Sequence, residues 1–316
     1  MHAPVPPSTP ADDAGGASAS ASRVDARASA RARQRLDAAP EPPWLHAEAA
    51  RRMAERLTWI KREPALVLDW SGRAGASAPS LAQAYPAARV LAVCPAGPGA
   101  EAAPPAPWWR RLWRPGEAEV AAVAVDATAG LGAGLLWSNM RLHFAPDPEP
   151  LMQAWHRATA PDGFLMFSTL GPGSLSLLRE VYDEAGWGTP HAPFVDMHDL
   201  GDMLVAHGWA EPVMDQETLR LTYRSPEALV TELHGLGANF SPRRFAGLRT
   251  PRWRSRLCHA LGQRAVDGLI TLDIELVYGH AFRAADAGPR VQAETQIALD
   301  EMKLMLRNAG PKKQAG

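Results

Sequence analysis

Residues 67–78 read VLDWSGRAGASA, an apolar strand pattern that ends in a carboxylate and continues into a turn containing two glycines. Val67 and Leu68 suit a buried parallel strand, and Asp69 stands where such a strand would end. In a sheet built from alternating strands and helices, the ligand lies beyond the carboxyl ends of the strands, near the first of them. The stretch therefore predicts a ligand site beside residues 69–76.

Apolar runs and helical patterns alternate beyond this strand. We expect strands at 66–69, 89–93, 118–125, 135–137 and 164–169, and helices at 45–62, 77–85 and 150–159. Such alternation is typical of βαβ units and predicts the α/β class, with a doubly wound, mostly parallel sheet. A proline-rich segment at 95–116 carries three tryptophans and is interpreted as a surface insertion that packs back onto the body.

Composition narrows the class of protein. The chain has 316 residues, 46% of them hydrophobic and 21% charged, which suits a globular protein of one large domain or two small ones. A formal net charge of -1 provides no global field for nucleic acid or an anionic membrane. Cys94 and Cys258 lie far apart without a CxxC spacing, so we expect no metal site. No membrane-length apolar run or secretory signal is present, and we expect a cytoplasmic protein.

The two ends of the chain differ in composition from its middle. Residues 1–42 are rich in Ala, Pro, Ser and Arg, and we predict a disordered tail there because so few apolar groups cannot offset the entropy of ordering. A transit peptide is the alternative, but Asp12, Asp13 and Asp25 count against it. We assign 43–283 to the globular domain. Residues 284–316 are expected to form a C-terminal appendage and tail, with a helix at 291–307.

The turn itself is a weak signal for a nucleotide. Only Gly72 and Gly75 are available for close approach of the backbone to a ligand. The sequence contains no GxSxG, HExxH or P-loop pattern, and it assigns no catalytic residue. His143 and His280 are candidate bases, although a histidine beside aromatic residues is more often structural.

Downstream motifs are more specific. Residues 135–175 contain Ser138-Asn139 after a strand, the Asp162-Gly163 turn, and a strand that ends in Thr169-Leu170, while ITLDIELVYGHAF occupies 270–282. Together they resemble class I S-adenosylmethionine-dependent methyltransferases, and more narrowly the malonyl-acyl-carrier-protein O-methyltransferases of biotin synthesis. The resemblance implies a seven-stranded sheet whose last strand is antiparallel, with helical insertions over the acceptor site. It also implies methylation of the free carboxylate of malonyl-acyl-carrier protein.

A second resemblance points to different chemistry. Residues 191–209 and 221–240 also look like a mitochondrial complex I assembly factor of this fold, which is understood to hydroxylate an arginine. Two alternatives to the methyltransferase therefore remain open. One is a hydroxylase-like assembly factor, and the other is a non-catalytic binding or assembly protein that has lost the cofactor site.

The resemblance also assigns the cofactor-binding residues, namely Asp69, Gly72, Gly75, Cys94, Asp126, Ser138 and Asn139. The family writes its first loop as Asp-Leu-Gly-x-Gly-x-Gly, but here only the last glycine is kept and Arg73 replaces the central one. Cys94 stands where the family has an acid that binds the ribose. Losing that acid costs about 2–4 kcal/mol of binding free energy for the cofactor. We therefore interpret the loop as a degraded site with weak affinity for S-adenosylmethionine, and expect Arg73 to point toward the methionine moiety.

A dense cationic run occupies residues 241–256. Arg243, Arg244 and Arg252 are its candidate contacts for an acidic acyl carrier protein and for a malonyl carboxylate. The alternative is a solvated helix face with no binding role.

Overall fold

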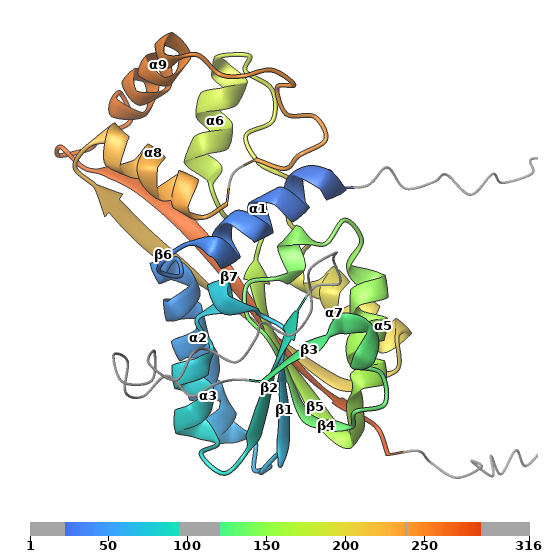
Figure 1. The fold of residues 1–316 in the computed structure, drawn as a ribbon. Coiled ribbons are helices and arrows are strands. Elements are labelled where there is room, and N and C mark those ends of the chain that lie inside the picture. Colours follow the sequence, from blue (N-terminus) through green and yellow to red (C-terminus); the bar gives the residue numbers. More distant parts are fainter. Residues whose placement is uncertain (1–22, 95–120, 238, 286–316) are drawn as a thin grey trace, which may run out of the picture. The chain divides into compact units, whose positions relative to one another are not determined.

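The computed structural model describes residues 23–94, 121–237 and 239–285 of the 316-residue chain. These residues form a seven-stranded sheet with the strand order β3-β2-β1-β4-β5-β7-β6 (Figure 1). The predicted α/β, doubly wound and mostly parallel sheet is confirmed. The predicted insertion at 95–116 and the predicted helix at 291–307 lie outside the described residues.

Five neighbouring strands of the sheet run parallel. They are β3 (Ala121–Ala124), β2 (Arg89–Cys94), β1 (Leu66–Asp69), β4 (Ala133–Ser138) and β5 (Thr159–Leu170). Strand β1 is central, pairing with β2 on one side and β4 on the other. Its Val67 and Leu68 are completely buried because helices cover both faces of the sheet.

The last two strands are long and antiparallel. Strand β7 (Ile270–Arg283) lies between β5 and β6 (Trp209–Tyr223), antiparallel to both, as predicted for residues 272–281. The pairing of β5 with β7 ends at Leu170 and Leu276, whereas β6 and β7 stay paired as far as Tyr223 and Ile270. The two strands therefore continue past the end of β5 and provide a floor for further helices.

Eight α-helices lie in the described residues, and all but the first of them cover the two faces of the sheet. They are α1 (Ala26–Ala38), α2 (Trp44–Arg56), α3 (Ala78–Ala84), α5 (Pro148–Ala158), α6 (Ser176–Glu184), α7 (Met197–Ala206), α8 (Pro226–Gly235) and α9 (Pro251–Gly262). One apolar core joins α2, α3, α6, α8 and α9 to one face of the sheet, and a second joins α5 and α7 to the other. Within the described ranges, none of the helices is both long and apolar enough to cross a bilayer.

Helix α1 corrects the prediction of a disordered tail over its described part. The Asp25 side chain caps this helix by accepting the N–H of Ala28 at 2.9 Å. Ser29, Ala32 and Leu36 are buried at helical spacing, and Ser29 donates to the carbonyl of Phe144 at 2.5 Å. The prediction of a disordered tail is wrong for residues 23–42. It was based on overall composition and did not take the helical spacing of Ser29, Ala32 and Leu36 into account. Residues 1–22 lie outside the described residues.

Candidate functional site

The turn after β1, residues 69–76, lies at the carboxyl edge of the sheet, and we call it the β1 loop. Asp69 is buried, and its carboxylate accepts the N–H of Ser71 at 2.9 Å. Gly72 has φ +65°, a conformation that favours glycine, and a short 3₁₀ turn at Arg73–Gly75 (η2) follows it. The loop is therefore a compact turn held by its own first carboxylate.

Asn139 ties the β1 loop to the end of β4. Its backbone N–H donates to Ser71 Oγ at 2.7 Å, and its Nδ2 donates to the carbonyls of Gly75 and His46 at 2.6 and 2.7 Å. Ser168 Oγ donates to Asn139 Oδ1 at 2.5 Å. Both amide hydrogens of Asn139 are thus used inside the protein, and its side chain fixes the loop.

The predicted site residues converge at this edge to different degrees. Asp69, Gly75 and Asn139 lie together, and Ser138 is the last residue of β4, with a buried hydroxyl that has no hydrogen-bond partner among the described residues. Cys94 ends β2 in register with Ala124 of β3. Asp126 follows in a short 3₁₀ turn (η3, Val125–Ala127) and is exposed.

Arg141 adds a cation that the sequence analysis missed. Its guanidinium lies against Gly72 so closely that a Cβ at that position would overlap Nη2. Nε donates to the carbonyl of Ser71, and Nη2 donates to both carboxylate oxygens of Asp37 on α1, at 2.7 and 2.9 Å. Asp37 Oδ1 also accepts the N–H of Ala74 at 3.2 Å. Helix α1 is therefore fastened across the β1 loop.

Arg73 behaves differently from the expectation. It is exposed, and its Nη2 donates to the carbonyl of Pro40 at 3.0 Å, in the connection between α1 and α2. Its side chain reinforces the closure of α1 over the loop, and the guanidinium that lies against the turn belongs to Arg141.

Burial dominates the charge states at this edge. It raises the pKa of Asp69 to about 6, although hydrogen bonds from Ser71 and the charge of Arg141 act in the opposite direction. Burial lowers the pKa of His46 to about 4 and that of His143 to about 3, so both imidazoles are neutral at pH 7. In the described ranges, no group of three or more His, Cys, Asp or Glu side chains is arranged to hold a metal ion.

An apolar cavity of about 440 Å³ opens under α6, α8 and α9, and we call it the apolar cavity. Its walls include Leu170, Leu178, Val230, Leu257 and Ile274. His143 lines it as well, and the pKa of His143, lowered first by burial, is lowered further by His46 and Arg141. His143 Nδ1 lies 3.4 Å from the hydroxyl of Thr169, and its ring packs against Phe144 and Phe194.

Two cations of the 241–256 run, Arg249 and Arg254, line the apolar cavity, and Arg249 is held there by aromatic contacts. Arg249 lines the cavity, lies over the Phe245 and Trp253 rings at 4.1 and 4.5 Å, and donates to the carbonyl of Trp187 at 2.7 Å. Of the predicted contacts in the same run, Arg243 and Arg252 are exposed on the surface.

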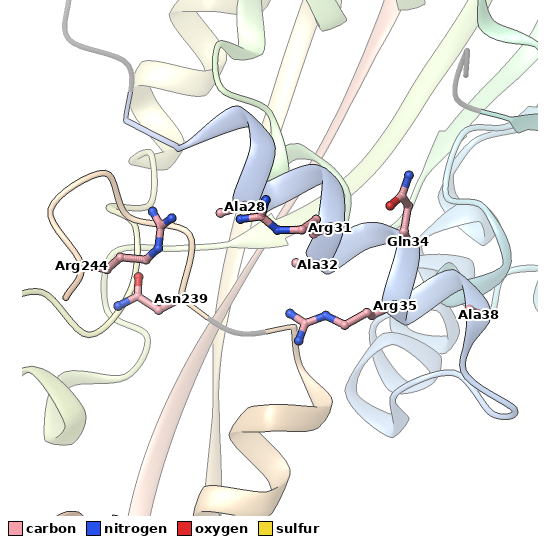
Figure 2. Close-up of a pocket in the computed structure, with 8 residues that line it drawn as sticks. All are labelled: Ala28, Arg31, Ala32, Gln34, Arg35, Ala38, Asn239 and Arg244. Carbon is pink, nitrogen blue, oxygen red and sulfur yellow. The ribbon is translucent and has the colours of Figure 1, made fainter. Parts of the chain in front are cut away.

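A second hollow, of about 470 Å³, adjoins the cavity, and we call it the arginine hollow. Figure 2 shows Arg31 and Arg35 of α1 on one side of it and Arg244 with Asn239 on the other. Arg244 pairs with Asp25 at 2.9 Å. Asn239 lines both the arginine hollow and the apolar cavity, which makes the two spaces neighbours.

Comparison with known proteins identifies the family, although no family model matches the chain. The chain is 36% identical over 257 residues to a malonyl-[acyl-carrier protein] O-methyltransferase of Gallionella capsiferriformans, covering 79% of this chain and 87% of the relative. It is also 36% identical over 252 residues to the enzyme of that name from Laribacter hongkongensis, covering 78% and 84%. Among solved structures it is similar to the YcgJ protein of Bacillus subtilis, with a TM-score of 0.48, 12% identity, and coverage of 75% and 98%.

The identity with these relatives extends over most of both chains, and the sheet has the seven strands and the antiparallel last strand that the resemblance to methyltransferases implies. The chain belongs to the malonyl-[acyl-carrier protein] O-methyltransferase family, a family of S-adenosylmethionine-dependent methyltransferases.

Proposed function

We propose that this protein transfers the methyl group of S-adenosylmethionine to the free carboxylate of malonyl-acyl-carrier protein, as the reaction in biotin synthesis requires. The observation that carries the proposal is an apolar cavity at the carboxyl edge of the sheet, lined by His143 and by Leu170 at the end of β5, in a chain of this family. Methylation removes the negative charge of the malonyl end, so that the chain can be elongated as an apolar acyl group.

The residues at the carboxyl edge fit the methyl donor in part. S-adenosylmethionine supplies the methyl group when it is bound. The N–H of Ala74 and the guanidinium of Arg141 are donors suited to its amino-acid end, and Gly72 leaves room for that guanidinium against the turn. The position of the ribose acid holds Cys94, whose thiol cannot form two charge-assisted bonds to the hydroxyls. Weak donor binding is therefore part of the proposal.

The acceptor needs placement more than acid–base help. A malonyl carboxylate is already ionised at neutral pH and can attack a methyl group without a base. The walls of the apolar cavity exclude water, which favours in-line attack over solvation of the carboxylate. Arg249 supplies a cation on the cavity wall that draws the carboxylate inward. Neutral His143 adds no positive charge that would repel the sulfonium.

We propose that the carrier protein docks beside the apolar cavity. Arg243 and Arg252 are exposed and offer cations to an acidic surface, whereas Arg244 is already paired with Asp25. Leu248, between Arg244 and Arg252 in the sequence, is 96% exposed. The arginine hollow lies next to the cavity and adds Arg31 and Arg35, which suits the phosphate of a carrier arm on its way to the acceptor site.

A non-catalytic binding role is the second candidate. It is favoured by the β1 loop, where Asn139 and Asp37 already take up polar groups that a ligand would otherwise meet. In that case the cavity would bind a partner or an acyl group without methyl transfer.

The decisive experiment is incubation with S-adenosylmethionine and malonyl-acyl-carrier protein, followed by intact-mass analysis of the carrier. The proposal predicts a gain of one methyl group that depends on the malonyl group. The double variant Arg243→Glu/Arg252→Glu should raise KM for the carrier about tenfold and leave turnover of malonyl-pantetheine unchanged. Arg220→Glu, at a surface ion pair between β6 and β7, is the matched control. No methylation at any donor concentration would favour the non-catalytic role.

A further inference from the structure

We propose that Arg141 and Arg33 form a binding site for a ligand carboxylate, and that this ligand is the amino-acid end of the methyl donor. The inference rests on the proposed function and adds the residues that replace the lost glycine contacts. In the structure, the carboxylate of Asp37 occupies this site.

The hydrogen-bond donors around Asp37 already form a site for a carboxylate. One carboxylate oxygen receives both the N–H of Ala74 and Nη2 of Arg141, at 3.2 and 2.7 Å, and the second oxygen receives Nη2 at 2.9 Å. A backbone amide in a glycine turn together with a guanidinium is a general recognition unit for carboxylates. Asp37 thus shows that the geometry accepts a carboxylate at this point of the loop.

Arg33 adds a second positive charge beside the pair of Asp37 and Arg141. Arg33 and Asp37 are four residues apart on α1 and share a face of the helix. Burial lowers the pKa of Arg33, as does the charge of Arg141, while Asp37 raises it, so the three groups lie close together. Arg33 Nε is buried and has no hydrogen-bond partner among the described residues. The Asp37 carboxylate is therefore paired with Arg141, while the nearby Arg33 keeps its positive charge and a buried Nε donor for a further anion.

The ligand carboxylate could belong to the methyl donor or to the malonyl acceptor, and the position of Arg141 favours the donor. Arg141 packs against Gly72 in the β1 loop, where the donor binds in this fold, whereas Arg249 serves the apolar cavity. A malonyl carboxylate held by two guanidinium groups would be a poor nucleophile, because the ion pair stabilises the lone pairs that must attack. The methyl donor carries a carboxylate that does not react, so a strong ion pair with it has no such cost.

The test compares two ligands that differ in this end alone. S-adenosylhomocysteine carries the amino-acid carboxylate, and methylthioadenosine lacks the amino-acid part. The unmodified protein should bind the first about tenfold or more tightly than the second, measured by ligand-observed NMR titration into the millimolar range. Arg141→Gln should remove that difference and leave the affinity for methylthioadenosine within about twofold. Arg33→Gln should act in the same direction.

Controls separate this inference from folding and from the proposed function. Arg220→Gln breaks a surface pair with Asp273 and should change neither affinity, and thermal unfolding of each variant checks that it is folded. Equal affinity of the unmodified protein for both ligands would overturn the inference and leave the methyltransferase proposal standing. The inference would also be overturned if Arg141→Gln lowered the affinity for malonyl-pantetheine but not for acetyl-pantetheine, because the bound carboxylate would then be that of the acceptor. If neither S-adenosylhomocysteine nor methylthioadenosine bound, both the inference and the proposed function would be overturned.

Discussion

The β1 loop and the apolar cavity lie at the same edge of the sheet but differ in how their groups are used. The polar groups of the loop are hydrogen-bonded within the chain, whereas the walls of the cavity are mostly apolar. In the loop, Asn139, Asp37 and Arg141 take up backbone groups, so that the chain's own side chains hold the turn. The cavity keeps about 440 Å³ open behind walls that are mostly apolar and need no polar partners. A turn that has lost glycines can stay ordered when side chains supply new bonds, whereas an acceptor cavity needs only the volume and apolarity of its walls.

Filling the cavity should have the largest effect. Val230 is buried on α8 and lines the cavity, so Val230→Trp would occupy much of its volume. We expect kcat/KM for malonyl-acyl-carrier protein to fall about a hundredfold, because the acceptor can no longer reach an aligned position. Affinity for S-adenosylhomocysteine should stay unchanged. Val205→Trp, at a residue 57% exposed on α7, is the matched control, and normal turnover of Val230→Trp would contradict the acceptor assignment.

Restoring the acid at the end of β2 should have the next largest effect, on the loop side. Cys94→Asp is expected to tighten binding of S-adenosylmethionine by roughly tenfold to a hundredfold, since a carboxylate can accept both ribose hydroxyls. Cys94→Ser, which adds no charge, should gain little. Because Arg73 points to Pro40, Arg73→Gly should add less than Cys94→Asp, and calorimetry of both single variants and the double variant measures each share. A gain that came from Arg73→Gly alone would contradict the observed placement of Arg73.

Asp69 provides a pH test of how tightly the loop is closed. Its pKa is raised from 3.8 to about 6 by burial, so the folded protein binds a proton more tightly than the unfolded chain does. The contribution of Asp69 to stability is therefore largest below about pH 4 and is lost as pH rises through 6. Asp69→Asn should raise the free energy of unfolding at pH 7.5 by about 1–2 kcal/mol and flatten its dependence between pH 4 and 6. Urea denaturation across that range tests this, with exposed Asp126→Asn as the control. An unchanged pH dependence would mean that the loop is open to water.

Weakening the ion pair between Asp37 of α1 and Arg141 should have the smallest effect. Asp37→Asn weakens the pair with Arg141, whose side chain is only 10% exposed, and we expect a loss of about 1 kcal/mol in stability. Hydrogen exchange of the Ala74 amide should rise with it, because that N–H loses a charged acceptor. Unchanged exchange at Ala74 would show that α1 is held over the loop by its apolar contacts alone.

The sequence predicted most of the sheet and part of the site. The alternation of strands and helices located β1, β2 and β5, and the family resemblance supplied the antiparallel β7. Asn139 was placed beside Gly75 because both follow strands that end at one edge. These are local patterns or strand-end rules, which one chain is enough to show.

The missed features depend on contacts between distant residues. Arg141 and Asp37 are 104 residues apart, and no local pattern joins them. Helix α1 was obscured because alanine and arginine dominate its composition, although Ser29, Ala32 and Leu36 already had helical spacing. Arg249 could be recognised as part of a cationic run, but not as the member whose aromatic partners turn it toward a cavity.

The most direct test of the account is a calorimetric titration of the unmodified protein with S-adenosylmethionine and S-adenosylhomocysteine. We expect saturable binding with a dissociation constant of roughly 0.1–1 mM, because we propose that Arg141 binds the amino-acid end and that Cys94 cannot replace an acid that would bind the ribose. A dissociation constant of about 1 µM or tighter would contradict the weakened β1 loop, and complete absence of binding would contradict a methyltransferase function.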